Sequence, residues 1–185
     1  FIKNKLSDDI NTIKKIYASI GFNFVDVNAK IEKFDDSRIN LVYVLDKGKK
    51  TNIKKINFIG DKKVKEKRLR DIIVSEENKF WKFLSKNTYL NSSNINLDKR
   101  LLINYYKSIG FYDVNVTSNI AKINKQGNAD LIYTVNEGKR FTINKISTNI
   151  DQIFDKKIFF PLNKIFSNYA GSYYSPFKIK KLLDE

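Results

Sequence analysis

The sequence predicts an α+β fold of tandem β-α-α-β-β modules, each a three-stranded mixed sheet covered on one face by two helices. Three observations predict it. Two motifs recur about 90 residues apart, which is the size of a small domain. Helix-like and strand-like hydrophobic periodicities follow each other in a fixed order within one repeat. Finally, 42% of the 185 residues are hydrophobic, which is enough apolar material to bury a core.

The repeat defines the organisation of the chain. The first motif, at residues 16–22 (IYASIGF), recurs at residues 105–111 (YYKSIGF). The second motif, at residues 48–56 (GKKTNIKKI), recurs at residues 138–146 (GKRFTINKI). Because the chain begins with Phe1 and has no Met, we expect it to be part of a longer protein. The register predicts three parts: residues 1–49, the end of one module; residues 50–139, a complete module; and residues 140–185, the start of the next.

The first half of the complete module has the pattern of a strand, a helix and an aromatic cluster. Residues 52–59 are typical of a strand and end at Gly60, which marks a turn. Residues 64–74 carry apolar side chains near helical spacing, with charged residues between them. The aromatic residues that follow are expected to be local core, because aromatic side chains bury large areas; the alternative is an exposed partner surface. They are Phe80, Trp81 and Phe83.

The second half of the module has the pattern of a helix and a hairpin. Residues 91–94 form a polar loop before an amphipathic helix over residues 97–109, and Gly110 ends that helix as a C-cap would. Residues 113–123 and 129–135 each alternate apolar and polar side chains, and a polar turn joins them. The alternation predicts that three side chains of the first of these strands belong to the core under the helices, namely Val114, Val116 and Ile120.

The leading part predicts the end of a similar module. A helix is expected over residues 8–20, with Ser7 as its N-cap. Two alternating strands are expected over residues 24–32 and 39–45. This part lacks the first strand and first helix of a module, so we expect it to expose apolar surface.

The trailing part predicts the start of a further module. A strand is expected over residues 141–149, followed by a helix over residues 155–166 and a second helix from Phe177. Pro161 is unfavourable inside the first of these helices, because proline removes a backbone donor.

The composition excludes most chemistry. The chain has no Cys and no His, which excludes zinc ribbons, thiol redox chemistry and His-based triads. Adjacent carboxylates such as Glu76 and Glu77 point apart in regular structure, so they are not expected to act as an acid/base pair. The net charge of +15 comes from scattered lysines, which we interpret as a solvated surface. We expect no enzyme, no cofactor and no metal.

The repeated motifs resemble those of a known family. The segment at residues 106–112 (YKSIGFY), with Val114 and Val116 after it, and the junction at residues 135–141 (VNEGKRF) carry the resemblance. The segment at residues 56–61 (INFIGD) and the aromatic cluster add to it. Together, in tandem register, they resemble the polypeptide-transport-associated (POTRA) domains of the BamA family of outer-membrane protein assembly factors. The aromatic match implies the first, second and third modules of such a protein.

The resemblance implies a non-catalytic periplasmic scaffold for outer-membrane β-barrel assembly. Its partners would be unfolded outer-membrane proteins, accessory assembly lipoproteins and a C-terminal barrel of the same parent chain, with no nucleic acid. POTRA domains capture substrates partly by adding a strand to the edge of the module's second strand, and residues 24–32 would be the equivalent edge in the leading part. The edge residues implied here are Asp113, Val114, Asn115, Val116, Thr117, Ser118, Asn119 and Ile120.

Two alternatives remain open. The same fold occurs in translocation-and-assembly, organellar import and two-partner secretion proteins, which differ in module number and barrel. A Lys-rich module could instead bind nucleic acid or anionic lipid, which predicts one contiguous basic face and binding that weakens steeply with salt.

Overall fold

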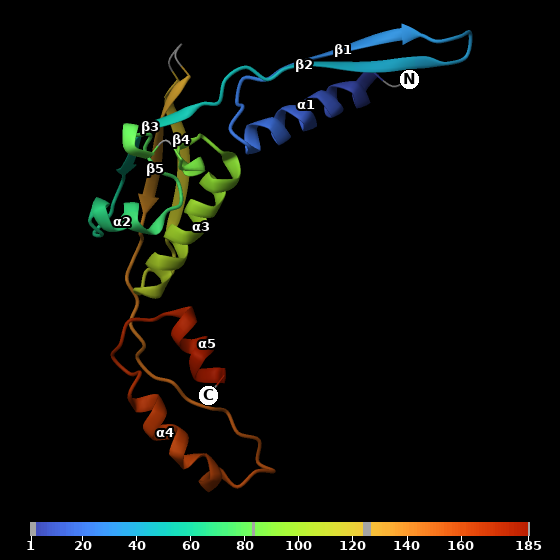
Figure 1. Ribbon diagram of the computed structural model, residues 1–185. Coiled ribbons are helices and arrows are strands. Elements are labelled where there is room, and N and C mark those ends of the chain that lie inside the picture. Colours follow the sequence, from blue (N-terminus) through green and yellow to red (C-terminus); the bar gives the residue numbers. More distant parts are fainter. Residues whose placement is uncertain (1–2, 83, 124–126, 185) are drawn as a thin grey trace.

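The computed structural model describes residues 3–82, 84–123 and 127–184, and Figure 1 shows its three consecutive parts. A helix and a two-stranded hairpin form the N-terminal part. A three-stranded sheet with two helices forms the middle module. Two further helices, joined by extended chain, form the C-terminal part. The predicted α+β class and the mixed three-stranded sheet are confirmed.

The N-terminal part consists of α1 (Lys3–Ser19), β1 (Asp26–Lys33) and β2 (Ile39–Asp46), with β1 and β2 antiparallel. The helix starts earlier than expected, so Ser7 lies inside it and the predicted N-cap is wrong. Most apolar side chains of the hairpin are exposed, because α1 is the only helix that packs on it among the described residues. The expected exposure of apolar surface is therefore found.

The middle module consists of β3 (Asn52–Ile59), α2 (Glu66–Ile72), α3 (Ser92–Ser108), β4 (Asn115–Ile123) and β5 (Asn128–Asn136). Two single 3₁₀ turns, η1 (Phe80–Lys82) and η2 (Lys86–Thr88), lie in the loop between the helices. The strand order is β3-β5-β4, with β3 parallel and β4 antiparallel to the central β5. Of the turn predicted between the last two strands, at residues 125–128, residues 125 and 126 lie outside the described residues, Gly127 has φ +76° and Asn128 begins β5.

Both helices of the middle module cover one face of the sheet and bury a single core. Along β5, every second residue from Ala129 to Val135 is buried, as the alternating pattern predicts. Leu69 from α2 and Leu102 from α3 pack on this face and are fully buried. Val114 and Val116 are buried as expected, but Ile120 is 40% exposed and does not belong to the core. Ile120 is still in unbroken register opposite the buried Leu131, and the ladder becomes irregular only after it, so the alternation holds up to Ile120 but the buried core does not extend over its side chain.

The second helix of the middle module begins several residues before the predicted start. Asn91 is its N-cap, and the Asn91 side chain accepts hydrogen bonds from the N–H groups of Ser93 and Asn94, at 2.8 and 3.1 Å. These bonds satisfy two of the free donors at the helix start. The expected loop at residues 91–94 is therefore a cap and the first turn of α3.

The C-terminal part contains η3 (Lys156–Phe159), α4 (Phe160–Ser167) and α5 (Pro176–Asp184). Pro161 lies in the first turn of α4, where proline is well accommodated. The strand expected over residues 141–149 is wrong, because Thr142 makes only an isolated bridge to Tyr173. In the middle module the first strand pairs with the third strand, and the described residues after 149 contain no strand to play that role.

Candidate functional site

The outer strand β4 is the candidate site. Among the strands that the structure describes, β4 pairs only with β5, so its other side is an edge of the sheet. No hydrogen bond from another described segment reaches the backbone of residues 115–120. The strand is nine residues long, which corresponds to about 30 Å of extended chain. An edge of this length can form several backbone hydrogen bonds with an added strand.

The side chains of β4 leave this edge accessible. Val114 and Val116 point into the core, whereas Asn115, Thr117 and Asn119 are exposed. Of the remaining predicted residues, Asp113 and Ile120 are exposed and Ser118 is half-buried. Asp113 and Val114 precede the strand itself. The predicted set therefore lies on one continuous segment, and its exposed members are small and polar apart from Ile120.

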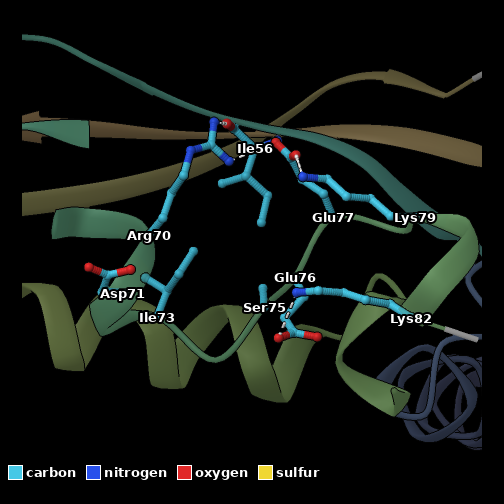
Figure 2. A pocket seen from close by; sticks show the side chains of 9 residues that line it. All are labelled: Ile56, Arg70, Asp71, Ile73, Ser75, Glu76, Glu77, Lys79 and Lys82. Atoms are coloured by element: carbon cyan, nitrogen blue, oxygen red, sulfur yellow. Dashed lines mark hydrogen bonds and ion pairs between the residues drawn. The ribbon is translucent and has the colours of Figure 1, made fainter. Parts of the chain in front are cut away.

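The opposite outer strand, β3, is closed by other parts of the module. The Glu77 carboxylate accepts a hydrogen bond from Ile56 N–H at 3.0 Å, and the Arg70 guanidinium donates one to the Ile56 carbonyl oxygen. The Asn78 N–H donates to the Ile53 carbonyl oxygen at 2.7 Å. Figure 2 shows Arg70 and Glu77 meeting at Ile56. These bonds occupy backbone groups of Ile53 and Ile56 that an added strand would need.

The closing residues hold one another in place. Arg70 Nη1 lies 2.6 Å from Glu77 Oε1, and Lys79 Nζ lies 3.7 Å from Glu77 Oε2. Partial burial opposes the charge of Glu77, but the hydrogen bonds from Ile56 N–H and Arg70 outweigh it, so the pKa of Glu77 lies below its usual value. The carboxylate is therefore charged and bonded at neutral pH.

A pocket of about 380 Å³ lies beside this pair, between β3, α2 and the following loop. Most of its charges are paired, since Lys82 Nζ also lies 2.9 Å from Glu76 Oε1. Its described lining residues carry three cations (Arg70, Lys79 and Lys82) and three carboxylates (Asp71, Glu76 and Glu77), so the formal charges of the lining cancel. The pocket therefore has no evident chemistry for binding a charged ligand.

A buried carboxylate anchors the loop that closes β3. Asp98 of α3 is fully buried and accepts hydrogen bonds from the N–H groups of Val74 and Ser75, at 2.6 and 3.2 Å. It also accepts one from the Tyr133 hydroxyl at 2.5 Å. Burial and the neighbouring Asp98 raise the pKa of Tyr133. The sequence does not indicate these roles of Arg70, Glu77 and Asp98, because each acts on a distant segment and no local pattern marks that contact.

The aromatic cluster is exposed rather than buried, which corrects the expectation of local core. The Phe80 side chain is 86% exposed and the Trp81 side chain is 60% exposed, and their rings pack edge to face at 4.6 Å. Phe83 lies outside the described residues. The lysines that flank the pair in this loop, Lys79 and Lys82, form ion pairs with Glu77 and Glu76. The lysines on both sides of the aromatic pair were the available signal in the sequence.

In the part of the chain that the structure describes, no group of His, Cys, Asp and Glu side chains is arranged to hold a metal ion. No helix of that part combines the length and apolar character needed to cross a membrane. The features that remain are the β4 edge and the exposed aromatic pair.

Comparisons with known proteins identify relatives. Residues 51–138 match the sequence model of the POTRA family, described as a surface antigen variable number repeat. The chain is similar to the outer membrane protein assembly factor BamA of Neisseria meningitidis serogroup B, with 23% identity over 186 residues, covering 100% of this chain and 23% of that protein. It is also similar to BamA of Buchnera aphidicola, with 27% identity over 159 residues, covering 85% of this chain and 24% of that protein. The chain thus spans 23–24% of the length of these relatives.

A solved structure shows the same fold. The crystal structure of Haemophilus influenzae BamA POTRA3-5 matches with a TM-score of 0.53 and 13% identity, covering 97% of this chain and 65% of that one. The resemblance to BamA POTRA domains, predicted from the tandem motifs, is confirmed by these matches.

Proposed function

We propose that the chain is a non-catalytic periplasmic scaffold of an outer-membrane protein assembly machine, because residues 51–138 match the POTRA family model and the chain is similar to BamA proteins. Its parts would be the end of one module (1–49), a complete module (50–139) and the start of the next (140–185). The parent protein would carry a C-terminal outer-membrane barrel. The names of the relatives support this role, and the observation that carries its mechanism is the difference between the two edges of the middle sheet.

The free edge of β4 is the proposed site for unfolded barrel substrates. Added strands bond to an edge mainly through backbone groups, so clients of different sequence can share one site. The β3 edge is occupied by Glu77, Arg70 and Asn78, which supports docking at β4 alone. The small polar side chains at Asn115 and Thr117 leave room for a partner strand.

The test is a titration of the isotope-labelled chain, followed by NMR, with a peptide copied from a transmembrane strand of an outer-membrane barrel protein. Expected are shifts along residues 115–120 that persist from low to moderate salt. The matched control is the same peptide N-methylated at alternate residues, which keeps its side chains but cannot form the ladder. Equal binding of both peptides, or shifts that scatter over lysines and vanish with salt, would refute strand addition; the second result would favour a Lys-rich binder of nucleic acid or lipid.

The exposed aromatic pair is a second proposed contact, for an accessory assembly lipoprotein. Exposed neighbouring aromatic residues are rare on free surfaces and common in the centres of protein interfaces. Trp81 is the only tryptophan in the chain, so its fluorescence reports directly on this surface. A lipoprotein partner should shift Trp81 emission and lose affinity with Phe80→Ala, whereas Tyr112→Ala, an exposed aromatic elsewhere, should leave binding unchanged. Unchanged emission on complex formation would refute this contact.

A further inference from the structure

The three parts of the chain are joined by two junctions that repeat the same contacts. At the first junction, the Thr51 N–H donates to the Gly21 carbonyl oxygen at 3.0 Å, and the Leu90 N–H donates to the Thr51 carbonyl oxygen at 2.7 Å. An isolated antiparallel bridge pairs Asn52 with Tyr89. The end of one module's last helix is thus bonded to the first residues of the next module.

The second junction has the same bonds one repeat later. The Phe141 N–H donates to the Gly110 carbonyl oxygen at 2.8 Å, and the Tyr174 N–H donates to the Phe141 carbonyl oxygen at 2.9 Å. An isolated antiparallel bridge pairs Thr142 with Tyr173. The two junctions thus share the same contacts, and the glycine and the first residue of the next module lie in the repeated motifs. The contacts are therefore a property of the repeat rather than of one site.

Each junction also holds one cation between two aromatic rings. At the first, Lys50 Nζ lies 5.3 Å from the centre of the Phe22 ring and 4.8 Å from that of the Tyr89 ring. At the second, Arg140 Cζ lies 5.5 Å from the centre of the Phe111 ring. These distances are within the range of cation–π attraction.

The partner ring at the second junction is Tyr173, whose centre lies 3.2 Å from Arg140 Cζ. One ring of each pair follows the helix-ending glycine of one module, and the other ring comes from the next module. The cation therefore contacts both modules at once, in addition to the backbone bonds.

The glycines make this close approach possible. Gly110 ends α3 with φ +104°, and a Cβ there would lie 3.0 Å from Arg140 Cγ and 3.1 Å from Tyr173 Cβ. Gly21 has φ +97°, and a Cβ there would lie 3.2 Å from Tyr89 Cβ. Both positions thus require glycine for the backbone conformation and for packing against the next module.

We propose that Lys50 and Arg140 are docking residues that fix the orientation of successive modules, with the next module of the same chain as the partner. Small interfaces between domains ordinarily permit relative motion, so the orientation requires a specific contact. The Arg140 junction is the stiffer of the two, because the planar guanidinium stacks on Tyr173 and its Nε also donates to the Ile109 carbonyl oxygen at 2.7 Å. This proposal does not depend on which client binds the β4 edge.

The test uses pairs of spin labels, because the chain has no native cysteine to interfere. Cysteines replacing the exposed Arg100 on α3 and Lys180 on α5 report on the second junction through the distribution of distances between the labels. Cysteines replacing Lys14 on α1 and Arg100 report on the first. Far-UV circular dichroism of each variant checks that its helices and strands persist.

Arg140→Ala should broaden the distance distribution across the second junction, and Arg140→Lys should broaden it less because the cation is kept. The control is Lys139→Ala, which removes an exposed cation one position earlier and should leave the distribution unchanged. At the first junction, Lys50→Ala should broaden the distribution and its neighbour Lys49→Ala should not. Equal distributions for Arg140→Ala and Lys139→Ala, whether both narrow or both broad, would overturn the proposal.

Discussion

Replacing Asp98 is expected to lower the stability of the middle module substantially. Its buried carboxylate satisfies two fully buried donors, the Ser75 N–H and the Tyr133 hydroxyl, besides the half-buried Val74 N–H. Each buried donor left without a partner costs about 1–3 kcal/mol, so Asp98→Ala should destabilise the module by about 2–6 kcal/mol. Domains are stable by only about 5–15 kcal/mol, so this is a large fraction of the total.

The measurement is native-state hydrogen exchange of the β5 amides in the whole chain, which gives the free energy of opening for this module without requiring the other parts to unfold together. Asp71→Ala, at an exposed position on α2, is the matched control and should change that free energy by less than about 0.5 kcal/mol. Tyr133→Phe should cost less than Asp98→Ala, because the carboxylate keeps its two N–H partners. A loss below about 1 kcal/mol for Asp98→Ala would refute the reasoning, since it would mean that the donors find other partners.

Three further predictions concern the edge, a cap and two turns. The pKa of Glu77 lies below its ordinary value of 4.5. The ionised carboxylate therefore contributes its full share of stability above about pH 4.5, and this stability is lost as the pH falls through the folded-state pKa. Exchange of the Ile56 amide, after correction for intrinsic rates, should therefore accelerate below about pH 4.5 in the wild type, and Glu77→Gln should remove that pH dependence. Asn91→Ala should cost about 1 kcal/mol in the same exchange assay, because α3 loses its N-cap bonds. Gly60→Ala should cost more than about 2 kcal/mol, because a Cβ there would overlap a backbone carbonyl of β5, whereas Gly171→Ala meets nothing within 4 Å and should cost about 1 kcal/mol from its positive φ alone. A cost at Gly171 equal to that at Gly60 in thermal unfolding would contradict the steric argument.

Local patterns predicted most of the fold. The alternation along residues 129–135 predicted a strand in which every second residue is buried, as the structure has it. Gly110 correctly marked the end of α3. The start of α3 was placed too late, because a polar run can be a loop or a capped first turn, and only the bonds to Asn91 distinguish them. The strand expected over residues 141–149 failed for a different reason: its sequence suits a strand, but a strand also needs a partner.

Only part of the candidate site could be predicted from the sequence, because the rest depends on contacts between distant segments. The position of residues 115–120 on an outer strand follows from the order of elements that the sequence indicates. The closure of the other edge does not, because it depends on Glu77 and Arg70 reaching Ile56 across 21 and 14 positions of the chain. Side-chain periodicity records which face of a helix or strand is buried, but it carries no information about which distant carboxylate meets which backbone group.

The closure of β3 also explains the adjacent Glu76 and Glu77, whose role the sequence alone does not indicate. A three-stranded sheet has two edges, and two open edges would allow both client binding and uncontrolled pairing between copies. Glu77 bonds to β3 itself, while Glu76 pairs with Lys82 and accepts a hydrogen bond from the Ser85 hydroxyl at 2.8 Å, which holds the loop against that edge. Opening β3 by Glu77→Ala should therefore add a second site for an extended peptide or promote self-association, both visible by analytical ultracentrifugation with and without peptide. A variant that stays monomeric and binds one peptide would show that Asn78 and Arg70 suffice to close the edge.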